Sequence, residues 1–462
     1  MSNAPADMCE GPLFVKIVRY TIPIILTGIL QLLFNAADLI VVGRFCGSVS
    51  VAAVGATGSI INLITNLFIG LSVGAGVTVA HGLGAEQDED VHRTVHTAIP
   101  TAFVSGLVLT VVGVLGAKYF LSLMGTPEDV IDLSTLYMRI YFCGILSSML
   151  YNFGAAILRA AGETKGPLYY LTIAGVLNVI LNVFFVVVFH MDVAGVALAT
   201  ALSQTLSAVL VLLALLRRED ACKLSFSKLR IYKKPLLQIV RIGLPAGIQG
   251  SLFSISNVII QSSVNSFGSV VMSGNAAAGN IEGFVYITMN AFQQSALNFT
   301  GQNFGAKKYE RIHRIMGICL LCVGCAGLLT GALAYAFARP LLAVYITDSA
   351  EAIGYGVLRM TYVCLPYFLC GLMDVMTGIL RGMGSSVATM LITILGVCGF
   401  RIGWIYTVFH MPEYHTLSSL YISYPISWFA TFAVQVAGYF LLCHLRKKKS
   451  GMETGSAAVS LK

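Results

Sequence analysis

Three acidic residues lie within stretches that are otherwise apolar: Asp38, Glu282 and Asp374. A carboxylate in a lipid-embedded segment is costly in free energy, so each is a candidate functional group. Asp38 is the most informative, because Gln31 and Asn35 precede it at intervals of seven and three residues. These intervals place the three side chains on one face of a helix. We therefore expect that face to line a cavity.

Further polar residues occur in two later apolar stretches. Asn178 and Asn182 are one helical turn apart, and Thr200 and Gln204 repeat that spacing. With Asp38 they supply one negative charge and several neutral oxygens, a set that suits one proton or one Na⁺. A carboxylate removed from water holds a proton more readily, which favours ion exchange at Asp38. The alternative is a carboxylate that only ties neighbouring helices together.

The second half of the chain is polar but carries less charge at the corresponding positions. Asp374 lies two turns before Arg381. Glu282 is expected near the outer end of its helix, where a carboxylate reaches the lipid headgroups as an alternative to a functional role. The remaining candidates for a substrate cavity are the amide side chains of Gln249, Asn257 and Gln261.

The elements that carry these residues are membrane-spanning helices. Of the 462 residues, 57% are hydrophobic and only 11% are charged, and the mean hydropathy is +0.82. Apolar stretches of about 18 residues or more, enough to cross a bilayer, recur along the whole chain. We place twelve, six in each half, which predicts an all-α integral membrane protein made of two pseudo-symmetric six-helix bundles. Continuous apolar runs exclude a transmembrane β-barrel.

The two halves resemble each other. Pro23 matches Pro245 at a shift of 222 residues, and residues 157–159 match 379–381 at the same shift. Such matches in a common order indicate duplication and fusion, and repeated halves usually place a binding site between them. Each proline lies inside the first helix of its half, where it removes a backbone hydrogen bond and allows a bend.

Charge predicts the orientation and the division of the chain. Most of the 29 Lys and Arg residues fall on the side that holds both termini, which the positive-inside rule makes cytoplasmic. We therefore expect a multi-pass protein of the plasma membrane. The expected parts are an N-terminal lobe (1–216), a basic cytoplasmic linker (217–235), a C-terminal lobe (236–446) and a cytoplasmic tail (447–462). The turns that follow Gly84 and Gly305 are expected to begin at a helix-ending glycine.

No phosphate-binding glycine loop, zinc motif or nucleophile elbow is present. An ATP-driven pump is therefore not expected, and we expect neither enzyme activity nor a cofactor. Energy for transport would come from an ion gradient.

Three segments resemble the multidrug and toxic compound extrusion (MATE) family: residues 35–44, the joint 158–162 with its repeat 380–384, and residues 301–306. The resemblance covers essentially the whole chain. It implies two six-helix lobes arranged in a V, alternating access, and export of cationic amphipathic drugs or toxic compounds in exchange for H⁺ or Na⁺. It also implies a monomer in contact with membrane lipids, small-molecule substrates and no nucleic-acid partner.

The resemblance further implies an ion site in the N-terminal lobe, whose residues fall on Asp38, Asn178, Asn182 and Thr200. Position 182 is Asn where the relevant relatives carry Asp, so a relay between two carboxylates is not expected. Asp38 alone would carry the coupling charge, as a proton acceptor or as a ligand of Na⁺.

Two rival functions fit the sequence less well. A flippase for lipid-linked oligosaccharides or polysaccharides resembles the same superfamily, and it would need a basic central cavity to hold a pyrophosphate. Arg139, Arg359 and Arg401 are too few and too peripheral for that purpose. An intramembrane prenyltransferase would need Asp-rich motifs for Mg²⁺-bound diphosphate, and the sequence has none.

Overall fold

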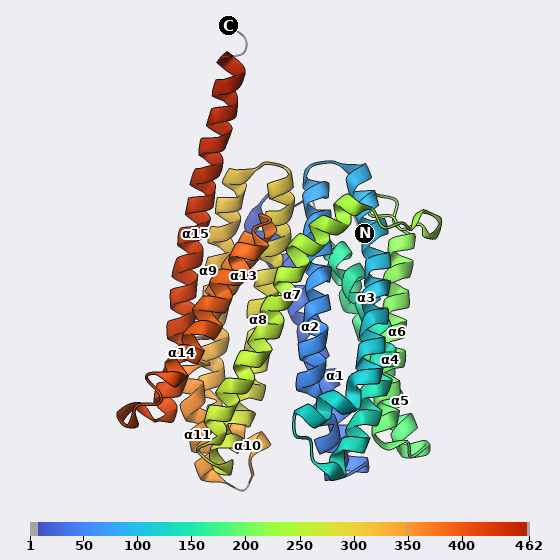
Figure 1. Cartoon of the computed structure of the whole chain (residues 1–462), viewed down its shortest axis with the longest axis vertical. Coiled ribbons are helices and arrows are strands. Elements are labelled where there is room, and N and C mark those ends of the chain that lie inside the picture. Colours follow the sequence, from blue (N-terminus) through green and yellow to red (C-terminus); the bar gives the residue numbers. More distant parts are fainter. Residues whose placement is uncertain (1–7, 348, 460–462) are drawn as a thin grey trace.

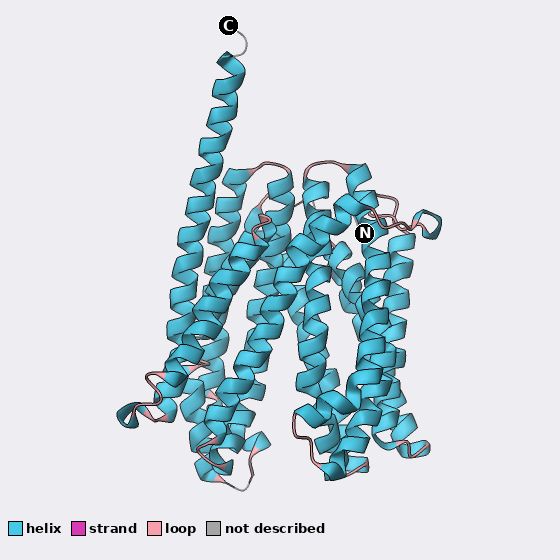
Figure 2. Ribbon diagram, viewed as in Figure 1, coloured by secondary structure: helices cyan, strands magenta, loops and turns pink. Residues whose placement is uncertain are grey.

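The computed structural model describes residues 8–347 and 349–459, and every regular element in these ranges is helical (Figure 2). The helices of the first half are α1 (Leu13–Phe45), α2 (Ser48–Gly84), α3 (Asp88–Leu123), α4 (Glu128–Ala160), α5 (Lys165–Val183), η1 (Phe184–Val188) and α6 (Asp192–Leu216). The linker holds η2 (Phe226–Lys228). The second half contains α7 (Lys233–Asn265), α8 (Ser269–Gly305), α9 (Tyr309–Ala336), α10 (Ala338–Tyr345), α11 (Ala350–Tyr362), α12 (Tyr367–Gly382), α13 (Ser386–Thr393), η3 (Ile394–Gly399), α14 (Phe400–Tyr406), η4 (Pro412–Tyr414) and α15 (Leu417–Val459).

The expectation of an all-helical membrane protein is confirmed. Within the described residues, ten helices are long and apolar enough to cross a membrane, or eleven if the bent pair of α11 and α12 forms one span. Helix α8 is as long as α2, 37 residues, but it is not among these spans because it carries many amides and Glu282. The count of twelve spans stays a prediction.

The two halves repeat each other in detail. α1 and α7 each have 33 residues, and α2 and α8 each have 37. A stretch of π-helix follows both α5 and α13. Gly162 and Gly384 both adopt a positive φ, 86° and 81°, where the chain leaves α4 and α12. These agreements are what a duplicated sequence predicts.

Figure 1 shows the helices of the first half on one side of the molecule and most of those of the second half on the other. The halves meet where α2 packs on α7 and α8. Gly70 and Gly74 face Gly243 and Gly247 so closely that a Cβ on any of them would overlap the backbone of the opposite helix. Small residues of this kind let membrane helices approach each other.

Helix α1 belongs to both halves. Its first part, including Leu13, Ile17 and Tyr20, is buried in a core shared with α8, α9, α12 and α15. Its last part, including Val41 and Val42, is buried against α2, α3 and α4. Helix α1, which the predicted N-terminal lobe (1–216) includes, therefore packs in both halves.

The helices α2 and α8 end at the expected glycines, but these glycines are not the residues that turn left-handed. Gly84 and Gly305 are the last helical residues, but the left-handed residues are Glu86 and Lys307, with φ of 55° and 58°. The amide of Gln87 donates to the carbonyl of Gly82, as in a Schellman motif. The two glycines instead permit contact between halves, because a Cβ at Gly84 would overlap the carbonyl oxygen of Gln302.

The linker packs on the first half. The amide of Ser225 donates to Nε2 of His96 at 3.0 Å, and the amide of Tyr232 donates to Oγ1 of Thr97 at 3.1 Å. At the other end of the chain, α15 continues past the expected boundary at residue 446 and runs beyond the bundle (Figure 1). The last part of the predicted tail, residues 460–462, lies outside the described residues.

Candidate functional site

Asp38 is joined to three other predicted site residues in one cluster, which we call the Asp38 cluster: Asp38, Asn178, Asn182 and Thr200. Nδ2 of Asn182 donates to one carboxylate oxygen of Asp38, and Oγ1 of Thr200 donates to the other at 3.3 Å. Asn182 also donates to Oδ1 of Asn178 at 3.2 Å, and Asn178 donates to Thr200 at 3.4 Å. Helices α1, α5 and α6 are thereby linked.

The surroundings of the cluster leave the carboxylate without a cationic partner. Among the described residues, no Lys or Arg forms an ion pair with Asp38. Oδ1 of Asn182 is buried and has no hydrogen-bond partner there. The cluster thus offers one unpaired carboxylate and neutral oxygens in a small hollow of about 90 Å³.

A larger cavity of about 590 Å³, the central cavity, lies next to this hollow. Its walls come from α1, α2, α4, α5, α6, α8 and α12, so both halves contribute. The hollow and the central cavity share five wall residues: Gln31, Asn35, Leu171, Gln204 and Ser207. The two spaces are therefore walled in part by the same side chains.

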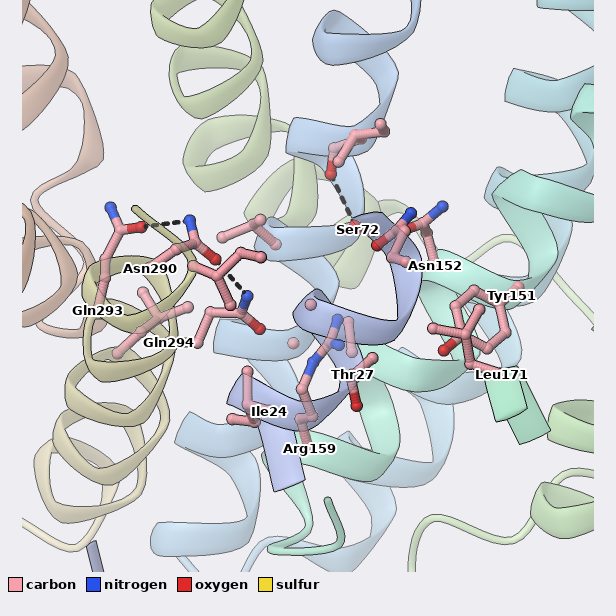
Figure 3. A pocket seen from close by; sticks show the side chains of 18 of the residues that line it. Ile24, Thr27, Ser72, Tyr151, Asn152, Arg159, Leu171, Asn290, Gln293 and Gln294 are labelled. Carbon is pink, nitrogen blue, oxygen red and sulfur yellow. Dashed lines mark hydrogen bonds between the residues drawn. The ribbon is translucent and has the colours of Figure 1, made fainter. Parts of the chain in front are cut away.

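Amides dominate the α8 wall of the central cavity (Figure 3). Asn290 donates to Oε1 of Gln293 at 3.3 Å and accepts from Nε2 of Gln294 at 2.8 Å. Ile24 and Thr27 of α1 face them, and Tyr151 and Asn152 of α4 lie farther along (Figure 3). The lining combines apolar surface with several hydrogen-bonding groups, as small-molecule sites do.

The predicted cavity residues divide into two sets. Gln31, Asn35 and Gln204 line the central cavity, whereas Gln249, Asn257, Gln261 and Asp374 do not. Gln249 accepts a hydrogen bond from Arg381 at 2.9 Å. Gln261 bonds to Asn265 and Asn275, and Asn257 is exposed on α7. Asp374 is buried on α12, and its Oδ2 has no hydrogen-bond partner among the described residues.

Glu282 does not reach toward the headgroups, so that alternative is wrong. It is 7% exposed and forms a two-pronged ion pair with Arg359 of α11, both N···O distances being 2.7 Å. Arg359 also donates to Asn275. Such a pair satisfies both charges internally, which is the usual arrangement for ionisable groups in a membrane. Arg401 is also buried, between Tyr424 and Trp428, so only Arg139 is peripheral as expected.

Two arginines that the sequence analysis placed in the joints 158–162 and 380–384 lie in the wall of the central cavity instead. Arg159 and Arg381, the last basic residues of α4 and α12, both line the central cavity. Their corresponding positions in the two halves of the repeat could have indicated that both arginines face the same cavity. The prolines also occupy matching, buried positions within α1 and α7.

A helical bundle with a polar cavity between repeated halves and a membrane-embedded carboxylate beside it defines a membrane transporter. The MatE family model matches residues 23–184 and 245–407. The chain therefore belongs to the MATE family of transporters, and it is not an enzyme. The expected resemblance is confirmed.

Two curated relatives from Bacillus subtilis extend the match. The chain is 27% identical over 439 residues to the probable multidrug resistance protein YoeA, covering 93% of this chain and 94% of YoeA. It is also 27% identical over 394 residues to the probable multidrug resistance protein YpnP, covering 84% and 87%. A solved outward-facing multidrug resistance MATE family transporter shares the fold, with a TM-score of 0.89 at 21% identity, covering 97% of this chain and 100% of that one.

Proposed function

We propose that the chain exports amphipathic small molecules across the cell membrane by alternating access, in exchange for H⁺ or Na⁺ bound at Asp38. The observation that carries this proposal is the shared wall: Gln31, Asn35 and Gln204 line both the hollow at Asp38 and the central cavity. The multidrug resistance names of YoeA and YpnP support drug-like substrates.

Helix α1 supplies a route for coupling. Its last part is held by Asn182 and Thr200 through Asp38, while its first part is packed in the other half of the molecule. Pro23 lies near the point where α1 changes sides, and Oγ1 of Thr21 bonds to Oγ of Ser295 at 2.8 Å. Proton or Na⁺ binding would change the hydrogen bonds at Asp38 and so the path of α1 past Pro23. Because Gln31 and Asn35 lie on the same helix and line the cavity, a change in the path of α1 would also change the affinity of the cavity for its substrate.

The orientation follows from charge. The turn after α8, with Lys307 and Lys308, and the linker are basic, so we place that end in the cytoplasm, together with both termini. Contacts between the halves gather there: Nε2 of His81 lies 2.6 Å from the carbonyl of Gly382, and Gln302 donates to the carbonyl of Ala160 at 2.7 Å. At the other end of α2, a Cβ at Gly55 would meet nothing within 4 Å. This arrangement supports a state that is closed to the cytoplasm.

The decisive test is efflux by the Asp38→Asn variant. Asparagine keeps the shape of the side chain but cannot exchange a proton or carry charge, so export driven by either gradient should fall to background. Dye efflux from cells expressing the protein would be measured with the Na⁺ and proton gradients varied separately. Asp132→Asn is the control, because Asp132 is an exposed carboxylate that pairs with Lys118 far from the cavity walls. Transport by Asp38→Asn at the wild-type rate would end the proposal.

A further inference from the structure

The central cavity is positively charged. Apart from tyrosines, the ionisable residues in its wall are Arg159 and Arg381, and none of the lining residues is Asp or Glu. Arginine stays protonated in proteins, so both positive charges persist at any pH at which the transporter works. A cationic molecule would meet two like charges in this cavity.

Arg381 has unused hydrogen-bonding capacity. It is 8% exposed, it donates through Nη2 to Oε1 of Gln249 at 2.9 Å, and its Nε has no partner among the described residues. Asp374 lies two turns earlier on α12 and interacts electrostatically with Arg381, but the two side chains form no ion pair and Asp374 does not line the cavity. Nε is itself buried, so the outer N–H groups of the guanidinium are the donors left to an acceptor from a ligand in the cavity.

Arg159 extends into the same cavity from the end of α4 (Figure 3). Its position is fixed through its backbone, since the hydroxyl of Tyr20 donates to its carbonyl oxygen at 2.8 Å. Within the described ranges, its guanidinium makes no hydrogen bond or ion pair. The side chain is half-buried and so remains available to a ligand.

We propose that the central cavity binds an amphipathic small molecule that carries an anionic group, a carboxylate, sulfonate or phosphate, held by Arg159 and Arg381. This inference rests on the proposed export function and concerns the charge of the exported molecule. Guanidinium groups recognise such anions through charge-assisted hydrogen bonds. The amides of Asn290, Gln293 and Gln294 would bond to neutral polar groups, and Ile24 and Leu32 would contact apolar parts. A cavity of about 590 Å³ is the size of a site for a drug-sized molecule.

The test compares two dyes that share a xanthene ring system and differ in charge, anionic carboxyfluorescein and cationic rhodamine 123. Full-length protein would be reconstituted in liposomes for transport, and carboxyfluorescein binding would be measured by fluorescence anisotropy on solubilised protein. Wild-type protein should bind and transport carboxyfluorescein. Arg159→Gln should weaken both by about tenfold or more, the usual effect of losing a charged hydrogen bond. Rhodamine 123 transport should not fall.

Two further variants keep the test independent of folding. Arg139→Gln is the control, because Arg139 is exposed on the same helix and does not line the cavity. Gln294→Glu places a carboxylate in the wall and should weaken carboxyfluorescein binding while improving that of rhodamine 123. Arg381→Gln should weaken carboxyfluorescein binding as Arg159→Gln does, and if it fails to fold, Arg159→Gln and Gln294→Glu still decide the question.

The outcomes separate this inference from the proposed function. Transport of rhodamine 123 without carboxyfluorescein, unaffected by Arg159→Gln, would overturn the anionic site and leave the exporter intact. Transport of neither dye under either gradient would contradict export itself. Translocation of a fluorescent prenyl phosphate in place of carboxyfluorescein would overturn both, because the anionic group would then belong to a lipid-linked molecule.

Discussion

At the scale of single residues, position 182 decides how Asp38 exchanges its ion. Asn182 donates to both Asp38 and Asn178, and these hydrogen bonds fix the position of the Asp38 carboxylate. A neutral amide does not neutralise the charge of that carboxylate. We expect Asn182→Asp to place a second carboxylate beside the first, and like charges so close favour a shared proton or a bound Na⁺. The pH or Na⁺ dependence of export should shift accordingly.

The shift would be measured as export rate against pH at fixed Na⁺, and against Na⁺ at fixed pH. Asn152→Asp is a useful comparison, because Asn152 lines the central cavity and not the Asp38 hollow. Profiles for Asn182→Asp that coincide with wild type would show that residue 182 contributes only packing.

Several site residues were predictable because membrane helices are long and regular. Spacings of three and four placed Gln31, Asn35 and Asp38 on one face, and the structure shows that face lining the hollow at Asp38. Arg159 and Arg381 were missed as cavity residues because each lies at a helix end, where sequence alone does not show whether a side chain turns inward. The Glu282 and Arg359 pair was missed because nothing local links residues so far apart in the chain.

At the scale of elements, the close contact of α2 with α8 depends on the absence of a side chain at Gly84. We expect Gly84→Ala to hinder closure between the halves, since its Cβ would overlap the carbonyl oxygen of Gln302. Overpacking of this kind costs about 1–3 kcal/mol, roughly a 5- to 150-fold change in the balance between conformations. Export should fall, and the cytoplasmic side should open more often.

Opening would be followed by spin-label distances between positions 86 and 307, whose exposed residues occupy matching turns. Gly58→Ala is the matched control on α2, because a Cβ at Gly58 meets nothing within 4 Å. An unchanged distance distribution in Gly84→Ala would show that this contact does not limit closure.

At the scale of the whole molecule, the linker joins the halves while packing on the first. Arg218 pairs with Asp220 and with Glu163, at 2.5 and 2.8 Å. Burial raises the pKa of Asp220, but the hydrogen bonds and charge of Arg218 outweigh it, so the pKa lies below its usual value. The ionised carboxylate therefore stabilises the docked linker above the usual Asp range, and this contribution is lost only as pH falls through the lowered pKa.

Asp220→Asn should loosen the linker by about 1 kcal/mol or less, because the pair is partly exposed to solvent. Papain cleavage within residues 217–235 should then rise by up to about fivefold. The difference from wild type should stay constant between pH 8 and 5, where Asp220 remains ionised. Glu219→Gln, an exposed neighbour, should cleave like wild type. A difference that vanishes by pH 5 would contradict the lowered pKa.

The fold was more predictable than its division into parts. Apolar stretches and the internal repeat predicted the helices and their correspondence, since both follow from local composition. The crossing of α1 between halves was not predictable, because apolar residues occur at both ends of the helix and the sequence does not show which core each end joins.

The buried pair of Glu282 and Arg359 has a consequence for biogenesis. Helix α8 emerges from the ribosome before α11, and a charged side chain at the centre of a span costs about 3 kcal/mol on insertion by the translocon. Glu282 has no partner until Arg359 has been synthesised, so α8 is expected to stay next to the translocon until then. The second half would then enter the lipid as a group of helices rather than one span at a time.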